Sequence, residues 1–180
     1  MARTDDLGGQ KLSEIADYHN DVVDSLRFFW QPSHQQGNLR FFGATHEEFR
    51  EALRELLLDR IEETEIRSTF AVLAAVEAAL RVDYLLRATR KRKDDLSRAF
   101  RELYGRRQER ARFDEDLLDL WARHHPELKR YIGELRAALK YRHWLAHGRY
   151  WQRPTSGRFD FVSIYGLAEL LLADFPLYRN

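Results

Sequence analysis

The chain has 180 residues, of which 44% are hydrophobic and 33% charged, with only four prolines and nine glycines. This composition is typical of a helical globular protein and excludes disordered and fibrous classes. Because the sequence contains no cysteine, it also excludes disulfides, thiolate nucleophiles and cysteine-based zinc sites. We therefore expect a single all-α domain over residues 1–180.

The N-terminus and the apolar stretches indicate a protein that neither enters nor crosses a membrane. No apolar signal core follows Met1, and the longest aliphatic run, residues 71–76, is far shorter than a membrane span. The net charge is only +1, but residues 87–112 hold eleven Lys or Arg against four Asp or Glu. We expect a cytoplasmic protein with a local basic patch.

The first predicted helix covers residues 11–30 and is followed by a loop over residues 31–44. Its apolar residues recur at spacings of three and four and define one buried face: Leu12, Ile15, Tyr18, Val22, Leu26 and Phe29.

The second predicted helix begins at a capping box formed by Thr45 and Glu48, and no residue that would end a helix follows before Thr89. Its second half, residues 70–86, is apolar nearly all round and should be buried. Glu77 lies on the apolar stripe of this half, where an unpaired carboxylate is too costly to keep. Glu77 therefore needs a partner.

Two shorter helices are predicted around residues 94–104 and 114–124. Pro126 suits the first position of the next helix, which should end at Gly148. A final helix is predicted over residues 159–175, although residues 158–162 could instead form a short extended piece. Together these elements predict an antiparallel helical bundle.

The helix that begins at Pro126 has a charged residue on its inward face. At about 100° per residue one stripe contains Leu128, Ile132, Leu135, Leu139, Arg142 and Ala146. Two helices of one small bundle thus each place a single charge of opposite sign among apolar residues. We predict that Glu77 and Arg142 meet.

The residues around Arg142 form three groups on this helix. His143 and His147 lie about 40° apart on the flank of the stripe and should face one shallow groove. Tyr141 and Trp144 should point away from the core, towards a partner subunit or the C-terminal segment, although Trp144 could equally be a core residue.

An arginine, four residues and a histidine at a helix end, in an all-helical domain of this size, resemble the HEPN family (higher eukaryotes and prokaryotes nucleotide-binding). The residue after the arginine in that family is usually polar, and here it is His143. In that family four to six residues separate the arginine from the histidine. Three other pairs in the chain fit this spacing, but their arginines precede non-polar residues: Arg27 and His34, Arg40 and His46, Arg136 and His143.

The resemblance implies a four-helix bundle with additional short helices and a metal-independent endoribonuclease, acting as a toxin or host-defence effector without a cofactor. In such enzymes the 2′-hydroxyl of the RNA attacks the phosphorus. His147 would then move protons, Arg142 would stabilise phosphate charge and His143 would assist, with Glu77 as the acidic residue on an earlier helix. The family brings two motifs together across a cleft, so we expect a homodimer.

Several alternatives remain open. His143 and His147 could bind a metal, but no third ligand is evident. Glu77 and Arg142 could form a purely structural pair. The chain could also be a non-catalytic HEPN-type binding or regulatory module that acts with a partner protein such as a nucleotidyltransferase. An antitoxin is a further possible partner.

The basic stretch carries a separate expectation. Its cations could contact an RNA backbone or simply form a solvated face. The residues assigned to RNA binding are Arg90, Lys91, Arg92, Lys93 and Arg149.

Overall fold

The computed structural model describes residues 11–31, 46–90, 92–146 and 159–178. Regular structure within these ranges is entirely helical, which confirms the predicted all-α bundle. The elements, in which η marks a short 3₁₀ or π-helical turn, are α1 (Leu12–Phe29), α3 (His46–Thr89), α4 (Asp95–Arg107), η1 (Gln108–Arg110), η2 (Phe113–Leu118), α5 (Asp119–His124), η3 (Pro126–Leu128), α6 (Lys129–Ala146) and α7 (Phe161–Asp174). None of the helices in these ranges is long and apolar enough to cross a membrane.

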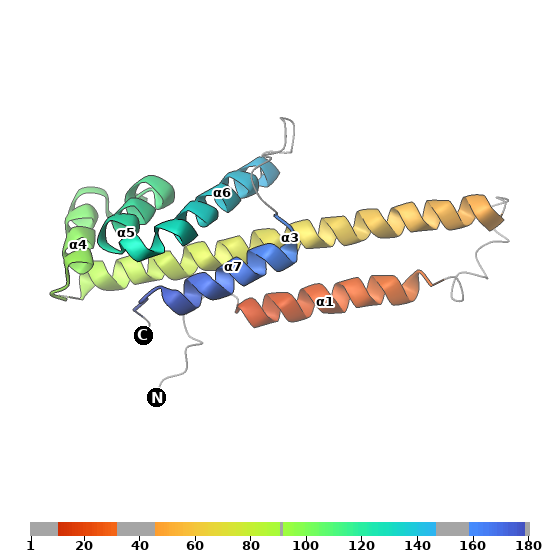
Figure 1. The fold of residues 1–180 in the computed structure, drawn as a ribbon, viewed down its shortest axis with the longest axis horizontal. Coiled ribbons are helices and arrows are strands. Elements are labelled where there is room, and N and C mark those ends of the chain that lie inside the picture. The colour runs from red at the N-terminus through yellow and green to blue at the C-terminus, as the bar shows by residue number, and fades with distance from the viewer. Residues whose placement is uncertain (1–10, 32–45, 91, 147–158, 179–180) are drawn as a thin grey trace.

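The helix α3 is the spine of the molecule. It has 44 residues and is therefore about 66 Å long at 1.5 Å per residue. It contains neither glycine nor proline, so nothing interrupts its hydrogen bonds, as the sequence predicts. Figure 1 shows α1 along its N-terminal half, α7 along its C-terminal half, α6 on another side, and α4 and α5 at its C-terminal end.

Side-chain caps explain where two of the other helices begin. Asp94 accepts a hydrogen bond from the amide of Ser97 at 2.9 Å and starts α4, and Asp160 accepts one from Ser163 at 2.8 Å and starts α7. Because α7 already includes Phe161, the extended alternative for residues 158–162 is wrong at that position. The bounds of the described helices lie close to the predicted ones. The predicted end of α6 at Gly148 lies outside the described residues.

The core is centred on Trp121 of α5, which is fully buried. Its ring lies 6.4 Å from that of Phe100 in α4 and 4.9 Å from that of Phe175 after α7. Tyr84 of α3 packs edge-on against Phe100 at 5.2 Å. Aromatic pairs at such distances add to the area that each ring buries, so they hold the C-terminal half of α3 to three other elements.

The predicted buried face of α1 is wrong at two positions. Tyr18 is 64% exposed and Phe29 is 59% exposed, whereas Ile15, His19 and Val23 are buried. The physical reason is a contact with α7, where the imidazole of His19 stacks on Phe161 with ring centroids 3.8 Å apart. Histidine is not counted as apolar in a periodicity analysis, so the sequence pattern alone places the face incorrectly.

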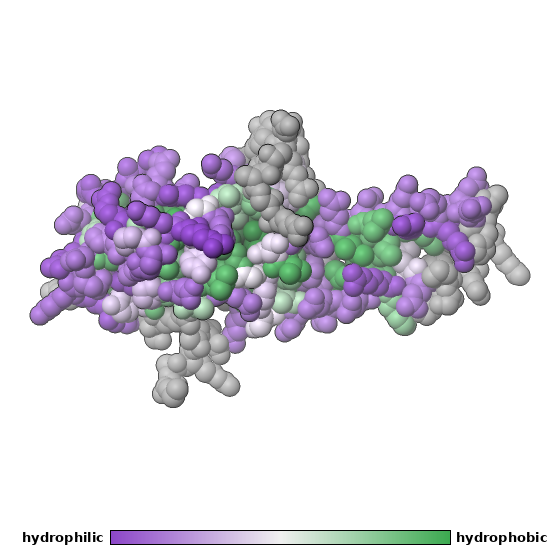
Figure 2. Space-filling view, in the orientation of Figure 1, coloured by the Kyte–Doolittle hydropathy of each residue, from purple (hydrophilic) through white to green (hydrophobic). Residues whose placement is uncertain are grey.

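One end of the molecule narrows to two helices, α1 and the N-terminal half of α3 (Figure 1). We call α1 together with residues 46–66 of α3 the arm. Figure 2 shows apolar surface on this arm. Its exposed large apolar side chains are Tyr18, Phe28, Phe29, Leu56 and Leu58.

A buried ion pair lies near the opposite end of α3. The Nε of Arg87 donates to both carboxylate oxygens of Asp83, at 2.9 and 2.8 Å, and these side chains are 4% and 0% exposed. The Nη2 of Arg87 donates to the carbonyl of Pro176 at 2.6 Å, and its Nη1 bonds Asp94 at 3.1 Å. The amide of Tyr178 donates to Asp83 at 2.7 Å. We call Asp83, Arg87, Asp94, Pro176 and Tyr178 the clamp.

Aromatic rings enclose the clamp. The guanidinium carbon of Arg87 lies 5.2 Å from the ring centre of Trp121 and 4.1 Å from that of Tyr178. Burial raises the pKa of Asp83, against the effect of the Tyr178 amide and of Arg87, which favour the carboxylate. Without Arg87 the charge of Asp83 would have no counterion in this enclosure.

Replacing Arg87 with methionine should therefore lower the free energy of unfolding by about 3–5 kcal/mol, because it leaves a buried carboxylate without its partner. Urea unfolding measures this loss. The matched control is Arg98→Ala, which removes an exposed pair with Asp95 and should cost less than about 1 kcal/mol. Equal losses in the two variants would show that the clamp has no special role in stability.

The buried His19 should make stability depend on pH. Burial, and then the charge of Arg27, lower the pKa of His19 from its ordinary value of 6.5. The unfolded chain therefore binds a proton near pH 6.5 that the folded chain does not, and stability falls as the pH falls below that value. Thermal unfolding at pH 7 and pH 5 should show a smaller drop in melting temperature for His19→Phe than for the wild type. An undiminished drop would contradict this assignment.

Candidate functional site

The predicted pair of Glu77 and Arg142 is present. The Nη1 of Arg142, on α6, donates a hydrogen bond to the Oε2 of Glu77, on α3, and the two form an ion pair. The side chain of Glu77 is 18% exposed and that of Arg142 is 29% exposed. The pair thus lies at the edge of the core, where part of each side chain is exposed to solvent.

A third charged residue, Arg81, completes this group. It lies one helical turn after Glu77, and its Nε donates to the Oε1 of Glu77 at 2.9 Å. Arg81 is not among the predicted site residues, although the spacing of four between a glutamate and an arginine on one helix is a usable signal. Each carboxylate oxygen therefore receives one guanidinium group, and two positive charges meet one negative charge. The group keeps a net positive charge, which favours an anionic ligand.

Aromatic rings and a backbone carbonyl hold both guanidinium groups in place. The guanidinium carbon of Arg142 lies 5.3 Å from the ring centre of Phe70, and that of Arg81 lies 5.4 Å from that of Phe113. The Nη1 of Arg81 also donates to the carbonyl of Ala111 at 3.2 Å. Cation–π contacts and hydrogen bonds of this kind limit side-chain rotation, so the charges are positioned before any ligand binds.

The carboxyl group of Glu77 is ionised at neutral pH. Burial opposes its ionisation, but the hydrogen bonds and charges of Arg142 and Arg81 outweigh burial and lower its pKa below the ordinary 4.5. Glu77 therefore acts as an acceptor and counterion here. It is not suited to donate a proton near pH 7.

Tyr141 does not face outwards. It is 2% exposed and stacks on Phe159, with ring centroids 4.8 Å apart. Trp144 is half-buried and stacks on Tyr141 at 5.7 Å. An interface role for Tyr141 is therefore wrong, and the expected contact with the C-terminal segment is the one observed.

The reason is a rotation of α6 relative to the predicted stripe. Its buried residues are Ile132, Leu135, Ala138 and Tyr141. After Leu135 the inward face therefore continues in steps of three, whereas the predicted stripe takes a step of four to Leu139. Both steps suit a period of 3.6 residues. Arg142 consequently lies at the margin of the face, which costs less than burying its charge completely.

The remaining catalytic candidates are only partly described. His143 is exposed on α6, next to Arg142. His147 and Arg149 lie outside the described residues, so the predicted groove between His143 and His147 stays a prediction. Within the described ranges no three histidines or carboxylates are grouped so that they could hold a metal ion. The alternative in which His143 and His147 bind a metal stays a prediction, because His147 lies outside these ranges.

The predicted RNA-binding cations that the structure describes are not next to this group. Arg90, Arg92 and Lys93 are exposed, but the guanidinium carbon of Arg92 lies 3.7 Å from the ring centre of Tyr178 in the clamp. Along α3, Arg90 is about 20 Å from Glu77 at 1.5 Å per residue. Lys91 lies outside the described residues.

Comparisons of the chain with models of protein families, with curated proteins and with solved structures find no match. The chemistry of Glu77, Arg81 and Arg142 is therefore the basis for a functional argument, together with the sequence motif.

The pKa of Glu77 should rise when a guanidinium partner is removed. In Arg142→Ala, the titration midpoint of the Glu77 carboxyl carbon, followed by NMR, should move upwards, and the contribution of the ion pair to stability should disappear. Because this pKa is lowered in the folded state, that contribution exists above pH 4.5 in the wild type and is lost as the pH falls through the folded value. The matched control is Arg67→Ala, which removes the partner of Glu63 on the same helix and should leave the Glu77 midpoint unchanged.

Proposed function

We propose that this chain is a metal-independent endoribonuclease of HEPN type, acting in the cytoplasm as a toxin or host-defence effector. The observation that carries the proposal is the partly exposed and fixed side chain of Arg142. Glu77 and Phe70 hold it on α6, one residue before His143 and five before His147. This supports the sequence motif, because it is the arrangement that phosphate recognition next to a proton-transfer group requires.

The reaction would cleave RNA at a phosphodiester. The 2′-hydroxyl oxygen of the ribose forms a bond to the adjacent phosphorus, and the bond from phosphorus to the 5′-oxygen breaks. The products are a 2′,3′-cyclic phosphate and a 5′-hydroxyl. His147 moves protons from the 2′-hydroxyl and to the leaving oxygen. Arg142 stabilises negative charge on the phosphate, and His143 assists it.

Glu77 acts in this scheme as a positioning residue. It holds Arg142 by one carboxylate oxygen while Arg81 occupies the other. Because the group retains a net positive charge, the ion pair does not cancel the attraction of Arg142 for phosphate. A conservative change such as Glu77→Gln should preserve part of the positioning, since the amide oxygen still accepts a hydrogen bond.

The proposal includes a homodimer, because Arg142 and His147 lie about 140° apart on an ideal helix and one motif is poorly arranged to act alone. The exposed face of α3 next to Arg142 is the surface that we assign to the second copy. Phe70 contacts Arg142 and is 37% exposed, as is Leu56. These two residues point within about 40° of each other on α3 but lie about 21 Å apart along it. The exposed pair of Glu63 and Arg67 lies between them, so only Phe70 adjoins the site.

The alternative is a non-catalytic HEPN-type module that acts with a partner such as a nucleotidyltransferase. One observation favours it: Arg142 already has a carboxylate partner and an aromatic contact, so a purely structural link between α3 and α6 would explain its place. In that case the molecule would bind its partner without cutting RNA.

Purified wild-type protein should cleave single-stranded RNA in excess chelator and leave a cyclic phosphate and a 5′-hydroxyl. Arg142→Ala and His147→Ala should each slow cleavage by about 100-fold or more, because each removes charge stabilisation or proton transfer. Gel analysis of end-labelled RNA measures both the rate and the product ends.

The matched control is Arg130→Ala, which removes an arginine of α6 that is 85% exposed and paired with Glu134. It should cleave at the wild-type rate. Absence of cleavage by the wild type would favour the non-catalytic alternative, and loss of cleavage with chelator alone would indicate a metal site. A strictly monomeric chain that still cuts RNA would contradict the dimer.

A further inference from the structure

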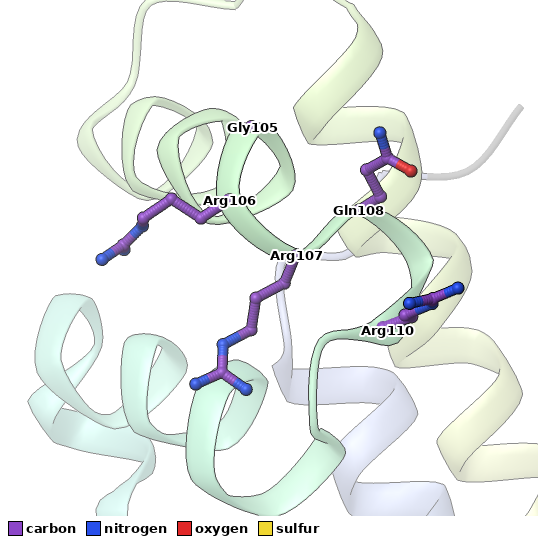
Figure 3. A pocket seen from close by; sticks show the side chains of 5 residues that line it. All are labelled: Gly105, Arg106, Arg107, Gln108 and Arg110. Carbon is purple, nitrogen blue, oxygen red and sulfur yellow. The ribbon is translucent and has the colours of Figure 1, made fainter.

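A basic hollow lies at the turn between α4 and η1. Its volume is about 450 Å³, and it is lined by Gly105, Arg106, Arg107, Gln108 and Arg110. Figure 3 shows that Arg106 and Arg107 extend to one side of this turn and Arg110 to the other. Three guanidinium groups thus come from six consecutive residues, at a place that the predicted RNA-binding set does not include.

The turn itself is held in an unusual conformation. Gln108 has a φ of 51°, a left-handed value that is uncommon for a residue other than glycine. The hydroxyl of Tyr84 donates to the carbonyl of Gln108 at 2.8 Å, and Arg81 holds the carbonyl of Ala111 at 3.2 Å. Burial raises the pKa of Tyr84 to about 12, so its hydroxyl remains a donor at any physiological pH. Such held, strained turns are concentrated at ligand-binding sites.

The charge of the hollow is only partly neutralised. Arg107 lies 3.6 Å from a carboxylate oxygen of Asp116, and the Nε of Arg106 donates to the carbonyl of Glu102 at 3.4 Å. Among the described residues no carboxylate forms an ion pair with Arg106 or Arg110.

Two nearby sources of negative charge do not neutralise the positive charge of these arginines. Glu109 is exposed and does not line the hollow. The C-terminus of α4 contributes about half a negative charge. The acidic residues that follow already have arginine partners: Glu115 pairs with Arg112, and Asp114 and Asp119 pair with Arg136. The hollow therefore keeps a positive charge.

We propose that the basic hollow binds the phosphate backbone of a single-stranded RNA, with Arg106 and Arg110 contacting different phosphates. The guanidinium groups spread over both sides of the turn, which suits a chain of phosphates better than one small anion. The choice of RNA rests on the proposed function. Along α3, Tyr84 is about 10 Å from Glu77, so a strand in the hollow is close to the candidate site, while Arg90 is twice as far away.

The test measures binding separately from cleavage. A short single-stranded RNA whose 2′-oxygens are methylated cannot undergo 2′-hydroxyl attack, so its affinity can be measured by fluorescence anisotropy with the full chain. For Arg106→Glu/Arg110→Glu we expect an affinity at least about tenfold lower at low salt. The slope of log affinity against log salt should become shallower by about 1.4, the loss of two phosphate contacts on a single strand.

The matched control reverses two exposed arginines of the arm, Arg54→Glu/Arg60→Glu, and changes the net charge by the same amount. It should retain the wild-type salt slope. A second variant, Arg106→Lys/Arg110→Lys, preserves the charge and should also retain the slope. Circular dichroism confirms that each variant is folded.

Each remaining outcome decides the question. Equal weakening in both charge-reversal variants, or no binding of this RNA by the wild type at low salt, would overturn the proposal. Competition by polyglutamate as effective as that by RNA would assign the hollow to an acidic protein and also overturn it. If hollow variants lose binding while wild-type protein never cleaves unmodified RNA, the proposed function fails and the binding site stands.

Discussion

The buried contact between Asp83 and Arg87 joins more of this molecule than any other interaction described above. A carboxylate in an apolar enclosure is tolerated only when a fixed cation and further hydrogen bonds accompany it. Arg87 supplies both, since it bonds Asp83, Asp94 at the start of α4 and the carbonyl of Pro176 after α7. The ends of three helices therefore meet around one guanidinium group.

Further polar side chains of α3 bond groups on other elements, at intervals of about one helical turn. Glu77 bonds α6, Arg81 bonds the residues before η2, Tyr84 bonds the start of η1, and Arg87 bonds the chain after α7. Each of these polar side chains satisfies a group on a different element. The polar residues of α3 thus link successive heights of this helix to different elements. They also connect the candidate site with the region of the basic hollow, because Arg81 bonds both Glu77 and the carbonyl of Ala111, which follows Arg110.

The sequence predicts the helices well, and it predicts one long-range contact. A long segment without glycine or proline has nothing to end its helix, so the sequence pattern predicts α3. Two opposite charges on apolar stripes avoid an unpaired buried charge by meeting, so the pattern also predicts the contact of Glu77 with Arg142. The clamp does not, because Arg87 begins a run of cations and its pattern is that of a solvated helix end. Only the tertiary position of the chain after α7 makes this arginine a buried one.

The sequence pattern also does not predict how α1 and α6 are rotated about their own axes. Steps of three and of four both keep residues on one face, so the choice between Tyr141 and Arg142 depends on Phe159, which stacks on Tyr141. His19 is buried for a comparable reason, as Phe161 lies against its ring. In both cases an aromatic residue at the start of α7 or just before it decides which face turns inwards.

The order in which the chain is synthesised gives the clamp a further significance. Arg87 and Asp83 are made early, but Pro176 and Tyr178, which bond them, follow 89 and 95 residues later. Domains fold as units while the ribosome adds residues from the N-terminus. The nascent chain must therefore keep the end of α3 open to water until the last helix has emerged, and only then can the two charges be withdrawn from solvent together.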